Sequence, residues 1–412
     1  MYKDQIAVLR ELGKQKAEIA ALDINRQKIR LWKDLNALKD TRPMVMMDQL
    51  PWNELDIDGQ LTTVCTDPFL KSLETDLRHT LFKWRYFKAD MVVHDRINLP
   101  KTVSNINIGP KVSEDVAVLD SGNSVVGHRY HDVIPDEKAL EEMLLPSVKT
   151  DPEYDRKRFD IASEIFAGIL PVHLSGITVH AGLWDRITML RGAEASLYDL
   201  VDRPDFTLKV VKKFTEIAMS LLDRFEELGL LEANAPLIHC TGAYTNELPA
   251  KDYEGSKAMA KDVWAFGMAQ IFSSVSPSMH DEFEIQPLKR YLERFGLLYY
   301  GCCEPLDKKI GIIKQIKNVR KISVSPWADK QRAAECIGKD YVFSNKPNPA
   351  FLAKESFDQD QIKKDLSETV RICKAYHTPC ELILKDVSTV WYKPERLIEW
   401  ERIAMDIVYN EF

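Results

Sequence analysis

Two adjacent cysteines follow an apolar stretch of the chain, in the run Tyr300-Gly301-Cys302-Cys303-Glu304-Pro305. Thiolates and carboxylates are ligands that Zn2+ accepts in proteins. Neighbouring residues of a strand point to opposite faces, so Cys302 and Cys303 can bind one ion only if the strand has ended before them. Free cysteines are also often simply buried among apolar side chains. The run therefore indicates either a metal site built on Cys302 and Cys303, with Glu304 as a neighbouring acid, or a packed pair of thiols.

A histidine follows a second apolar stretch, in the run Ile238-His239-Cys240-Thr241-Gly242. Imidazole is the commonest metal ligand in proteins and also serves as a general acid near neutral pH. We expect His239 to be a third metal ligand beside the two thiols, or a catalytic acid. The alternative is a hydrogen-bonded histidine of the core with no chemical role.

Charged and amide side chains follow two further apolar stretches. Lys385 and Asp386 come directly after residues 382–384, and this pair can be a structural ion pair, a further metal ligand or an acid–base group. Asn345 and Lys346 precede Pro347, which stiffens the loop that contains them. They can therefore present an amide and a cation to a ligand, or form a plain turn with a solvated lysine.

Short apolar runs alternate along the chain with segments of helical spacing, which predicts parallel strands connected by helices. The predicted strands are residues 91–93, 171–174, 237–239, 269–272, 297–300, 321–324, 341–343 and 382–384. The clearest predicted helices are residues 206–228, 282–295, 329–337, 360–375 and 394–408. About eight strand–helix units in order predict an α/β fold, a (β/α)8 TIM barrel, whose active-site mouth lies at the C-terminal ends of the strands. An open doubly wound sheet is disfavoured because no glycine-rich dinucleotide turn follows any predicted strand.

The chain is expected to consist of two parts. Residues 1–45 read as a helical extension packed on the barrel or on a second subunit, because apolar residues recur there at three- and four-residue spacing among many charges. Residues 46–412 form the barrel, with a β-hairpin inserted at residues 101–134 around a turn at residues 121–123.

The composition excludes several classes of function. The net charge of -7 is spread along 412 residues, without the basic stripe that nucleic-acid binding needs. No apolar run reaches the length of a membrane span, and the first five residues lack the apolar core of a signal peptide. Seven cysteines are an odd count, which argues against a disulfide framework and for a reducing compartment. We therefore expect a cytoplasmic protein that binds neither nucleic acid nor a membrane.

Two segments resemble the uroporphyrinogen-decarboxylase-like superfamily of (β/α)8 barrels. Residues 182–206, with Leu190-Arg191-Gly192, look like a characteristic helix of that superfamily, and residues 297–349 resemble its strand–cysteine–glycine block. The resemblance covers about residues 160–410. The arginine-rich N-terminal motif of the true decarboxylases is missing, which argues against porphyrin chemistry. In the corrinoid-linked branch a zinc site is built from a His-x-Cys strand end and a later Cys; here Tyr300 stands in place of that His, and Cys302 carries over directly.

The chain looks most like the substrate-specific methyltransferases of anaerobic O-demethylase systems. The resemblance implies transfer of a methyl group from an aryl methyl ether to the Co(I) centre of a separate corrinoid protein. It implies a zinc ion or proton donor near the thiols, with roles for His239, Glu304 and Asp386, because phenolate is a poor leaving group. The residues expected to bind the substrate are Tyr244 and Trp327, which would stack on its ring, and Asn345 and Lys346, which would hold an ortho substituent.

Other interpretations stay open at this point. They are a methylcobamide:thiol methyltransferase, a decarboxylase on the same barrel, and a non-catalytic protein that binds a partner through residues 1–40. A homodimer is also compatible with the sequence.

Overall fold

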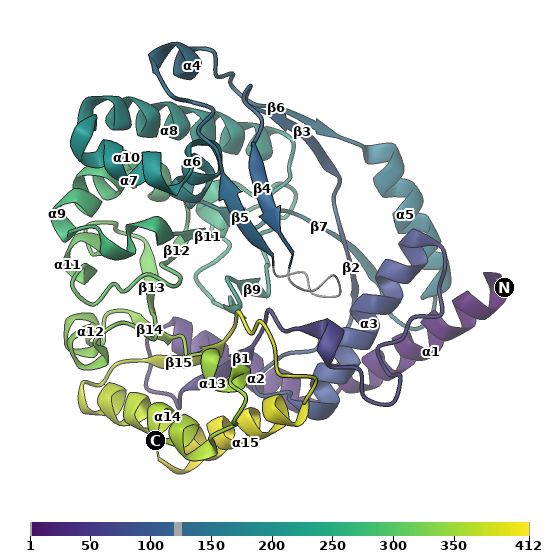
Figure 1. The fold of residues 1–412 in the computed structure, drawn as a ribbon. Helices are drawn as coiled ribbons and strands as arrows, with labels where there is room; N and C mark the ends of the chain where they lie inside the picture. The colour runs from purple at the N-terminus through teal and green to yellow at the C-terminus, as the bar shows by residue number, and fades with distance from the viewer. Residues whose placement is uncertain (1, 119–125, 412) are drawn as a thin grey trace.

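Seven parallel strands form one curved sheet in the computed structural model, which describes residues 2–118 and 126–411 (Figure 1). In spatial order they are β1 (Met44–Met47), β15 (Cys380–Leu384), β14 (Val342–Asn345), β13 (Val319–Val324), β12 (Leu297–Tyr300), β11 (Trp264–Gly267) and β8 (Val179–His180). Each pair of neighbours is parallel. The C-terminal ends of the strands therefore lie at one edge, where a barrel of this kind carries its active site.

Most helices that follow β8 lie on the outer side of this sheet (Figure 1). Four long helices precede β8, namely α1 (Tyr2–Ala20), α2 (Asp23–Asn36), α3 (Pro68–Tyr86) and α5 (Pro152–Ile165), and α1 packs against α3 and α5. Those that follow are α6 (Leu183–Arg191), α7 (Ala193–Asp202), α8 (Pro204–Glu227), α10 (Gln286–Leu292), α12 (Lys330–Ile337), α14 (Gln359–Ala375) and α15 (Glu395–Asn410). Short helical segments are η1 (Trp52–Glu54), α4 (Glu137–Glu141), η2 (Ala260–Asp262), η3 (Gln270–Ser274), α9 (Pro277–His280), the π-helical η4 (Asp281–Ile285), α11 (Ile310–Ile313) and α13 (Ala350–Ala353).

The sheet is barrel-like but does not close, so the prediction of a closed eight-stranded barrel is wrong. Within the described residues, β1 and β8 are the two edges of the sheet. Residues 91–93, predicted as a strand, run near β1, but side chains of α2 bond their backbone. The Trp32 indole N–H donates to the Asp90 carbonyl at 3.0 Å, and the Val93 N–H donates to Asn25 Oδ1 at 2.9 Å. Backbone groups that are already bonded in this way cannot join a strand ladder.

The helices predicted from apolar spacing are confirmed, and the strand predictions are confirmed only in part. Strands β12 to β15 lie where the apolar runs placed them. The run at residues 269–272 falls in η3 instead, where the Phe272 N–H bonds to the Ala269 carbonyl three residues back. The strand of the sheet in this region, β11, lies a few residues earlier, and the apolar pattern predicts neither β11 nor β1.

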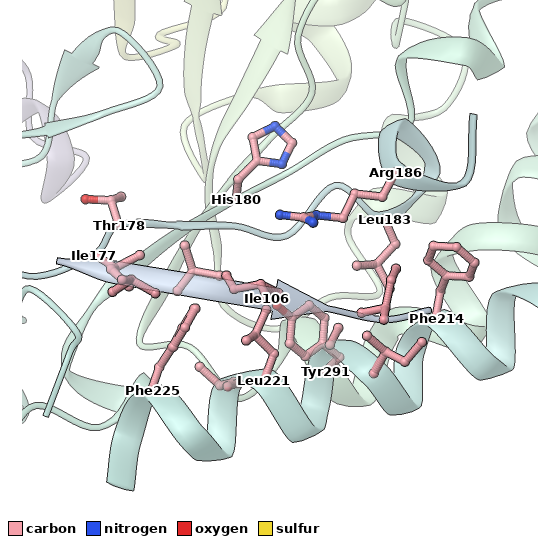
Figure 2. A pocket seen from close by; sticks show the side chains of 16 residues that line it. Ile106, Ile177, Thr178, His180, Leu183, Arg186, Phe214, Leu221, Phe225 and Tyr291 are labelled. Atoms are coloured by element: carbon pink, nitrogen blue, oxygen red, sulfur yellow. The ribbon is translucent and has the colours of Figure 1, made fainter. Parts of the chain in front are cut away.

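The chain between α3 and α6 adds strands outside the main sheet. They are β2 (Ile97–Pro100) paired in parallel with β7 (Val172–Ser175), β3 (Val103–Asn107) paired antiparallel with β6 (Ser147–Thr150), and β4 (Glu114–Ala117) paired antiparallel with β5 (Gly127–Tyr130). The turn predicted at residues 121–123 lies outside the described residues. Strand β3 crosses over α8 and covers a cavity there (Figure 2).

The N-terminal helices pack on the rest of the chain. Trp32 and Leu35 of α2 are buried against residues of the sheet interior, and α1 packs against α3. The expected division between residues 45 and 46 falls inside β1. None of the helices in the described part of the chain combines the length and the apolar character that a membrane span requires.

A small hairpin fills the interior of the curved sheet. Its arms are β9 (Leu237–Ile238) and β10 (Thr241–Gly242), so the predicted strand at residues 237–239 is not a strand of the barrel. Its two-residue turn is His239-Cys240, and both residues have positive φ, 41° and 67°. These values match a type I′ turn, which usually takes Asn-Gly because positive φ is strained in other residues. Gly242 lies against Trp32, and a Cβ at this position would approach the Trp32 ring to 2.4 Å.

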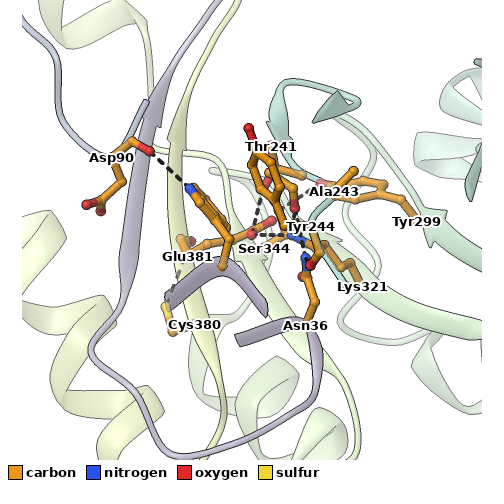
Figure 3. Close-up of polar contacts among 12 residues, drawn as sticks. Asn36, Asp90, Thr241, Ala243, Tyr244, Tyr299, Lys321, Ser344, Cys380 and Glu381 are labelled. Carbon is orange, nitrogen blue, oxygen red and sulfur yellow. Dashed lines mark hydrogen bonds and ion pairs between the residues drawn. The ribbon is translucent and has the colours of Figure 1, made fainter. Parts of the chain in front are cut away.

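An ion pair buried in the sheet interior holds this hairpin (Figure 3). Lys321 of β13 and Glu381 of β15 are fully buried, and their charged groups are 2.7 Å apart. Glu381 also accepts a hydrogen bond from the Thr241 hydroxyl at 2.7 Å, and Lys321 donates to the Gly242 carbonyl at 3.2 Å. The hairpin is therefore bonded to two different strands through one pair of charges.

We predict that Lys321→Met lowers the free energy of unfolding by about 3–5 kcal/mol, because it leaves the Glu381 carboxylate buried without its counter-charge. Urea unfolding followed by circular dichroism measures the change. The double variant Lys321→Met, Glu381→Leu serves as control, since it removes both charges and should regain much of the loss. A single variant as stable as the unaltered protein would contradict this account of the hairpin.

Candidate functional site

The ends of β12 and β15 and the turn of the hairpin meet at the C-terminal edge of the sheet. The Lys385 ammonium lies 3.1 Å from Cys302 Sγ and 3.3 Å from His239 Nε2. Lys385 and Cys302 are buried, while His239 is half-buried. The structure thus brings together the imidazole and the first thiol that the sequence analysis singled out, with Lys385 between them.

The second thiol and Asp386 complete the cluster on its solvent side. Cys303 Sγ lies 3.5 Å from Cys302 Sγ and 3.6 Å from an oxygen of Asp386, which in turn is 2.9 Å from the Lys385 ammonium. Strand β12 ends before the thiols, and Gly301 turns the chain with a φ of 94°. The two neighbouring cysteines are therefore no longer held on opposite faces of a strand.

Charge within the cluster is divided unequally. A hydrogen bond from Cys303 lowers the pKa of Cys302, and the Lys385 cation lowers it further, while the same bond raises the pKa of Cys303. Burial opposes the charge on Lys385, but Cys302 and Asp386 outweigh it and raise the pKa of Lys385. Burial and two nearby lysines lower the pKa of His239. His239 is therefore a neutral acceptor, and the cation of the cluster is Lys385.

Aromatic rings and a second lysine form the inner wall of the site. The His239 ring stacks on Phe266 with centroids 3.6 Å apart, and Tyr299 lies 5.2 Å from His239. The Lys346 ammonium lies 5.0 Å from the centre of the Tyr299 ring and donates to the Ser344 hydroxyl at 3.0 Å. Burial lowers the pKa of Lys346 to about 8, so a large part of this lysine is charged at neutral pH.

Three side chains of the cluster fit a metal ion by type and spacing. Ligand atoms of Cys302, Cys303 and Asp386 all lie within 4.8 Å of one another. Two thiols and a carboxylate are a donor set that suits zinc. His239, expected to be the third ligand, is not a member of this group, and Asp386 takes that place. The Lys385 ammonium already contacts Cys302 and Asp386, so it would compete with a metal ion for two of the three ligands.

Glu304, expected to be catalytic, lies behind the thiols and away from solvent. It is fully buried and accepts hydrogen bonds from the backbone N–H groups of Cys302 at 2.9 Å and Ala269 at 3.4 Å. Burial raises its pKa. These contacts make Glu304 a positioning residue for the loop that carries the thiols.

The four residues expected to bind the substrate are not brought together. Lys346 faces the site, and Asn345 beside it is fully buried, with no partner for either polar atom of its amide within the described residues. Tyr244 lies elsewhere, with its hydroxyl 2.6 Å from His94 Nε2, on a cavity that it shares with Trp32. Trp327 is 71% exposed and lines a different cavity. Tyr244 and Trp327 therefore do not face the thiols.

One acidic residue near the site was missed by the sequence analysis. Asp185 lies in the first turn of α6, 3.9 Å from His180. Burial raises its pKa to about 7, and the charge of Glu304 adds to the effect. An acid in the first turn of a helix is ordinary, so the sequence held no signal for this shift. The shift comes mainly from burial and to a lesser extent from Glu304, which lies far away along the chain.

Comparisons with known proteins identify the fold alone. No family model matches the sequence, and no curated protein matches it. Among solved structures, the fold is similar to that of a methyltransferase from Methanosarcina mazei, with a TM-score of 0.51 and 12% sequence identity. The similarity covers 92% of this chain and 98% of that chain. At this low identity, the likeness establishes a shared fold and does not extend to the reaction.

We predict that Asp185→Asn stabilises the protein at about pH 8 and has a smaller effect at about pH 5. A carboxyl whose pKa is raised in the folded state favours folding below its usual pKa, and this contribution is lost as the pH rises toward 7. The gain at the higher pH should be about 1–2 kcal/mol, since partial exposure screens the charge. Urea unfolding at both pH values measures it. An equal effect at the two pH values would argue against a titrating Asp185.

Proposed function

We propose that this protein is a methyltransferase that moves a methyl group from a methoxylated aromatic compound to the Co(I) centre of a separate corrinoid protein. The observation that carries the proposal is the Lys385 cation held between Cys302 and His239 at the C-terminal edge of the sheet. The resemblance of the sequence to O-demethylase methyltransferases supports the choice of reaction. The fold that the chain shares with a protein named a methyltransferase is compatible with it.

The reaction needs positive charge at the oxygen that departs. The bond between oxygen and the methyl carbon breaks, and its electron pair stays on the oxygen as a phenolate. The two electrons of the new cobalt–carbon bond come from Co(I), which is formally oxidised to Co(III). A fixed cation that faces the oxygen stabilises the developing charge without having to reorganise.

Two lysines can supply this charge. Lys385 remains an ammonium because Cys302 and Asp386 raise its pKa, and His239 Nε2 accepts one of its N–H groups. Of the three contacts that the Lys385 ammonium makes, the one with His239 Nε2 is the longest, and an ether oxygen can take its place. Within the described residues, the Lys346 ammonium donates a single hydrogen bond, to the Ser344 hydroxyl. Its remaining N–H groups are free for an oxygen substituent on the ring.

The aromatic part of the substrate needs an apolar surface near these cations. One face of the His239 ring is covered by Phe266, and the half-buried imidazole can offer its other face to the ring of the substrate. In this arrangement His239 positions both Lys385 and the substrate, and a proton need not leave the imidazole.

Zinc belongs to the same proposal as a resident ion. Cys302, Cys303 and Asp386 would hold it, and Lys385 would then turn away from them. A zinc ion in this position supplies Lewis acidity toward an oxygen or a thiol. The same donor set favours one second candidate function, methyl transfer from a methylated corrinoid to a thiol, because such a reaction activates the thiol on a metal.

We predict that the protein converts a reduced corrinoid protein to its methylated form when a suitable methoxyaromatic compound is present. The spectral change from Co(I) to methyl-cobalt measures the rate. Lys385→Met should lower this rate about 100- to 1000-fold, as expected for loss of a group that stabilises an oxyanion. The rate should also fall as the pH rises through about 8, because Lys346 then loses its charge.

The exposed Lys363 of α14 provides a matched control, and Lys363→Met should leave the rate unchanged. Absence of a spectral change across a broad panel of aryl methyl ethers would reject the proposal. Methylation of a thiol by the methylated corrinoid protein would favour the second candidate, and release of carbon dioxide without any corrinoid would favour a decarboxylase.

We predict that the freshly purified protein contains about one zinc ion per chain, as expected for two thiols and a carboxylate that leave one position of a zinc ion open. Cys302→Ala should lose the ion, while Lys385→Met should bind it more tightly because the competing ammonium is removed. Elemental analysis after dialysis against a weak chelator measures both effects. A metal-free protein that still transfers methyl groups would leave stabilisation of the departing oxygen to the Lys385 cation.

A further inference from the structure

A second cavity, of about 290 Å³, lies outside the cluster of thiols (Figure 2). Helix α8 forms its floor, the edge strand β8 forms one side, and the inserted segment around Ile106 of β3 covers it. The floor and the cover are apolar, with aliphatic side chains such as Ile217 and Leu221 from α8 and Ile106 from β3. Such a space is close to the lower size limit of small-molecule sites.

One cation faces this apolar space without a partner. Arg186 of α6 lines the cavity, and within the described residues its guanidinium makes no ion pair and no hydrogen bond. His180 also lines the cavity, but burial lowers its pKa, so the imidazole is neutral. Arg186 therefore carries the only full charge among the described residues that line the cavity. Figure 2 shows Arg186 and His180 on the side of the cavity opposite α8.

One buried hydroxyl faces the same space. Tyr291 of α10 is 3% exposed and lines the cavity, and its hydroxyl has no hydrogen-bond partner within the described residues. Two other buried tyrosines differ in this respect, since Tyr299 bonds to Ser344 and Tyr300 bonds to His280. Burial raises the pKa of Tyr291, although the nearby charge of Arg186 opposes the shift. The hydroxyl therefore keeps its proton and can donate a hydrogen bond to a ligand.

We infer that this cavity binds a small monocarboxylate with an aliphatic chain. The planar guanidinium of Arg186 matches the two oxygens of a carboxylate, and the Tyr291 hydroxyl offers a further donor to the same group. The chain of the ligand lies between α8 and the cover formed by β3. A single cation and a single buried donor suit one carboxylate and no second charged group. This binding does not depend on the proposed methyl transfer.

Calorimetric titration of the full chain, without any corrinoid protein, tests the inference with straight-chain carboxylates from butanoate to decanoate. Affinity should rise about fourfold per methylene until the cavity is filled. Arg186→Gln should weaken octanoate binding about 10- to 100-fold, and Tyr291→Phe about 2- to 10-fold. Octanol, which has the chain without the charge, should bind at least about tenfold more weakly than octanoate.

The matched control is Arg290→Gln, which removes an exposed arginine next to Tyr291 on α10 that does not line the cavity. Its affinity for octanoate should equal that of the unaltered protein. The inference is overturned if no carboxylate of the series binds, if octanol binds as tightly as octanoate, or if Arg290→Gln and Arg186→Gln weaken binding equally. Melting curves of each variant verify that Tyr291→Phe is folded.

Discussion

The buried pair of Lys321 and Glu381 determines where the hairpin inside the sheet can lie. A carboxylate and an ammonium without solvent must satisfy each other and their remaining bonds within the protein. Here Lys321 Nζ and Glu381 Oε2 bond to Thr241 and Gly242 of the hairpin, while Glu381 Oε1 has no partner among the described residues. The pair therefore fixes one end of the hairpin deep in the sheet. Its strained turn, with His239 at the tip, is held at the mouth as a consequence.

With the turn fixed, the chemistry at the C-terminal edge of the sheet depends on which of the groups there are charged. The neutral His239 and the thiol of Cys302 approach the same ammonium from two sides. Glu304, on the buried side of the thiols, accepts a hydrogen bond from the Cys302 backbone N–H and so positions the loop that carries them. A cluster arranged in this way can hold a negative charge that develops on a bound oxygen, which is the physical basis of the proposed methyl transfer.

Because the sheet is open, it has two edges, β1 and β8, and a different part of the chain lies against each of them. At the β1 edge, side chains of α2 bond the backbone of residues 90–93, so a strand cannot add there. At the β8 edge, the inserted strand β3 lies over α8 and encloses an apolar cavity beside the strand. His180, at the end of β8, contacts Phe266 with ring centroids 4.9 Å apart, and Phe266 stacks on His239. Phe266 therefore lies between His180, which lines the cavity, and His239 of the candidate site.

The sequence by itself determined which segments are helices and which apolar runs are followed directly by polar side chains. Apolar spacing locates α8, α12, α14 and α15 because a helix buries one face at a regular period. It did not determine closure of the sheet or the role of residues 237–239, since an apolar run indicates burial without indicating the pairing partner. Only the tertiary structure decided that Lys385 lies between Cys302 and His239, which are distant in sequence. Contacts of this kind, and the pKa shifts that follow from them, depend on how strands are ordered in space, and no local pattern of residues encodes that order.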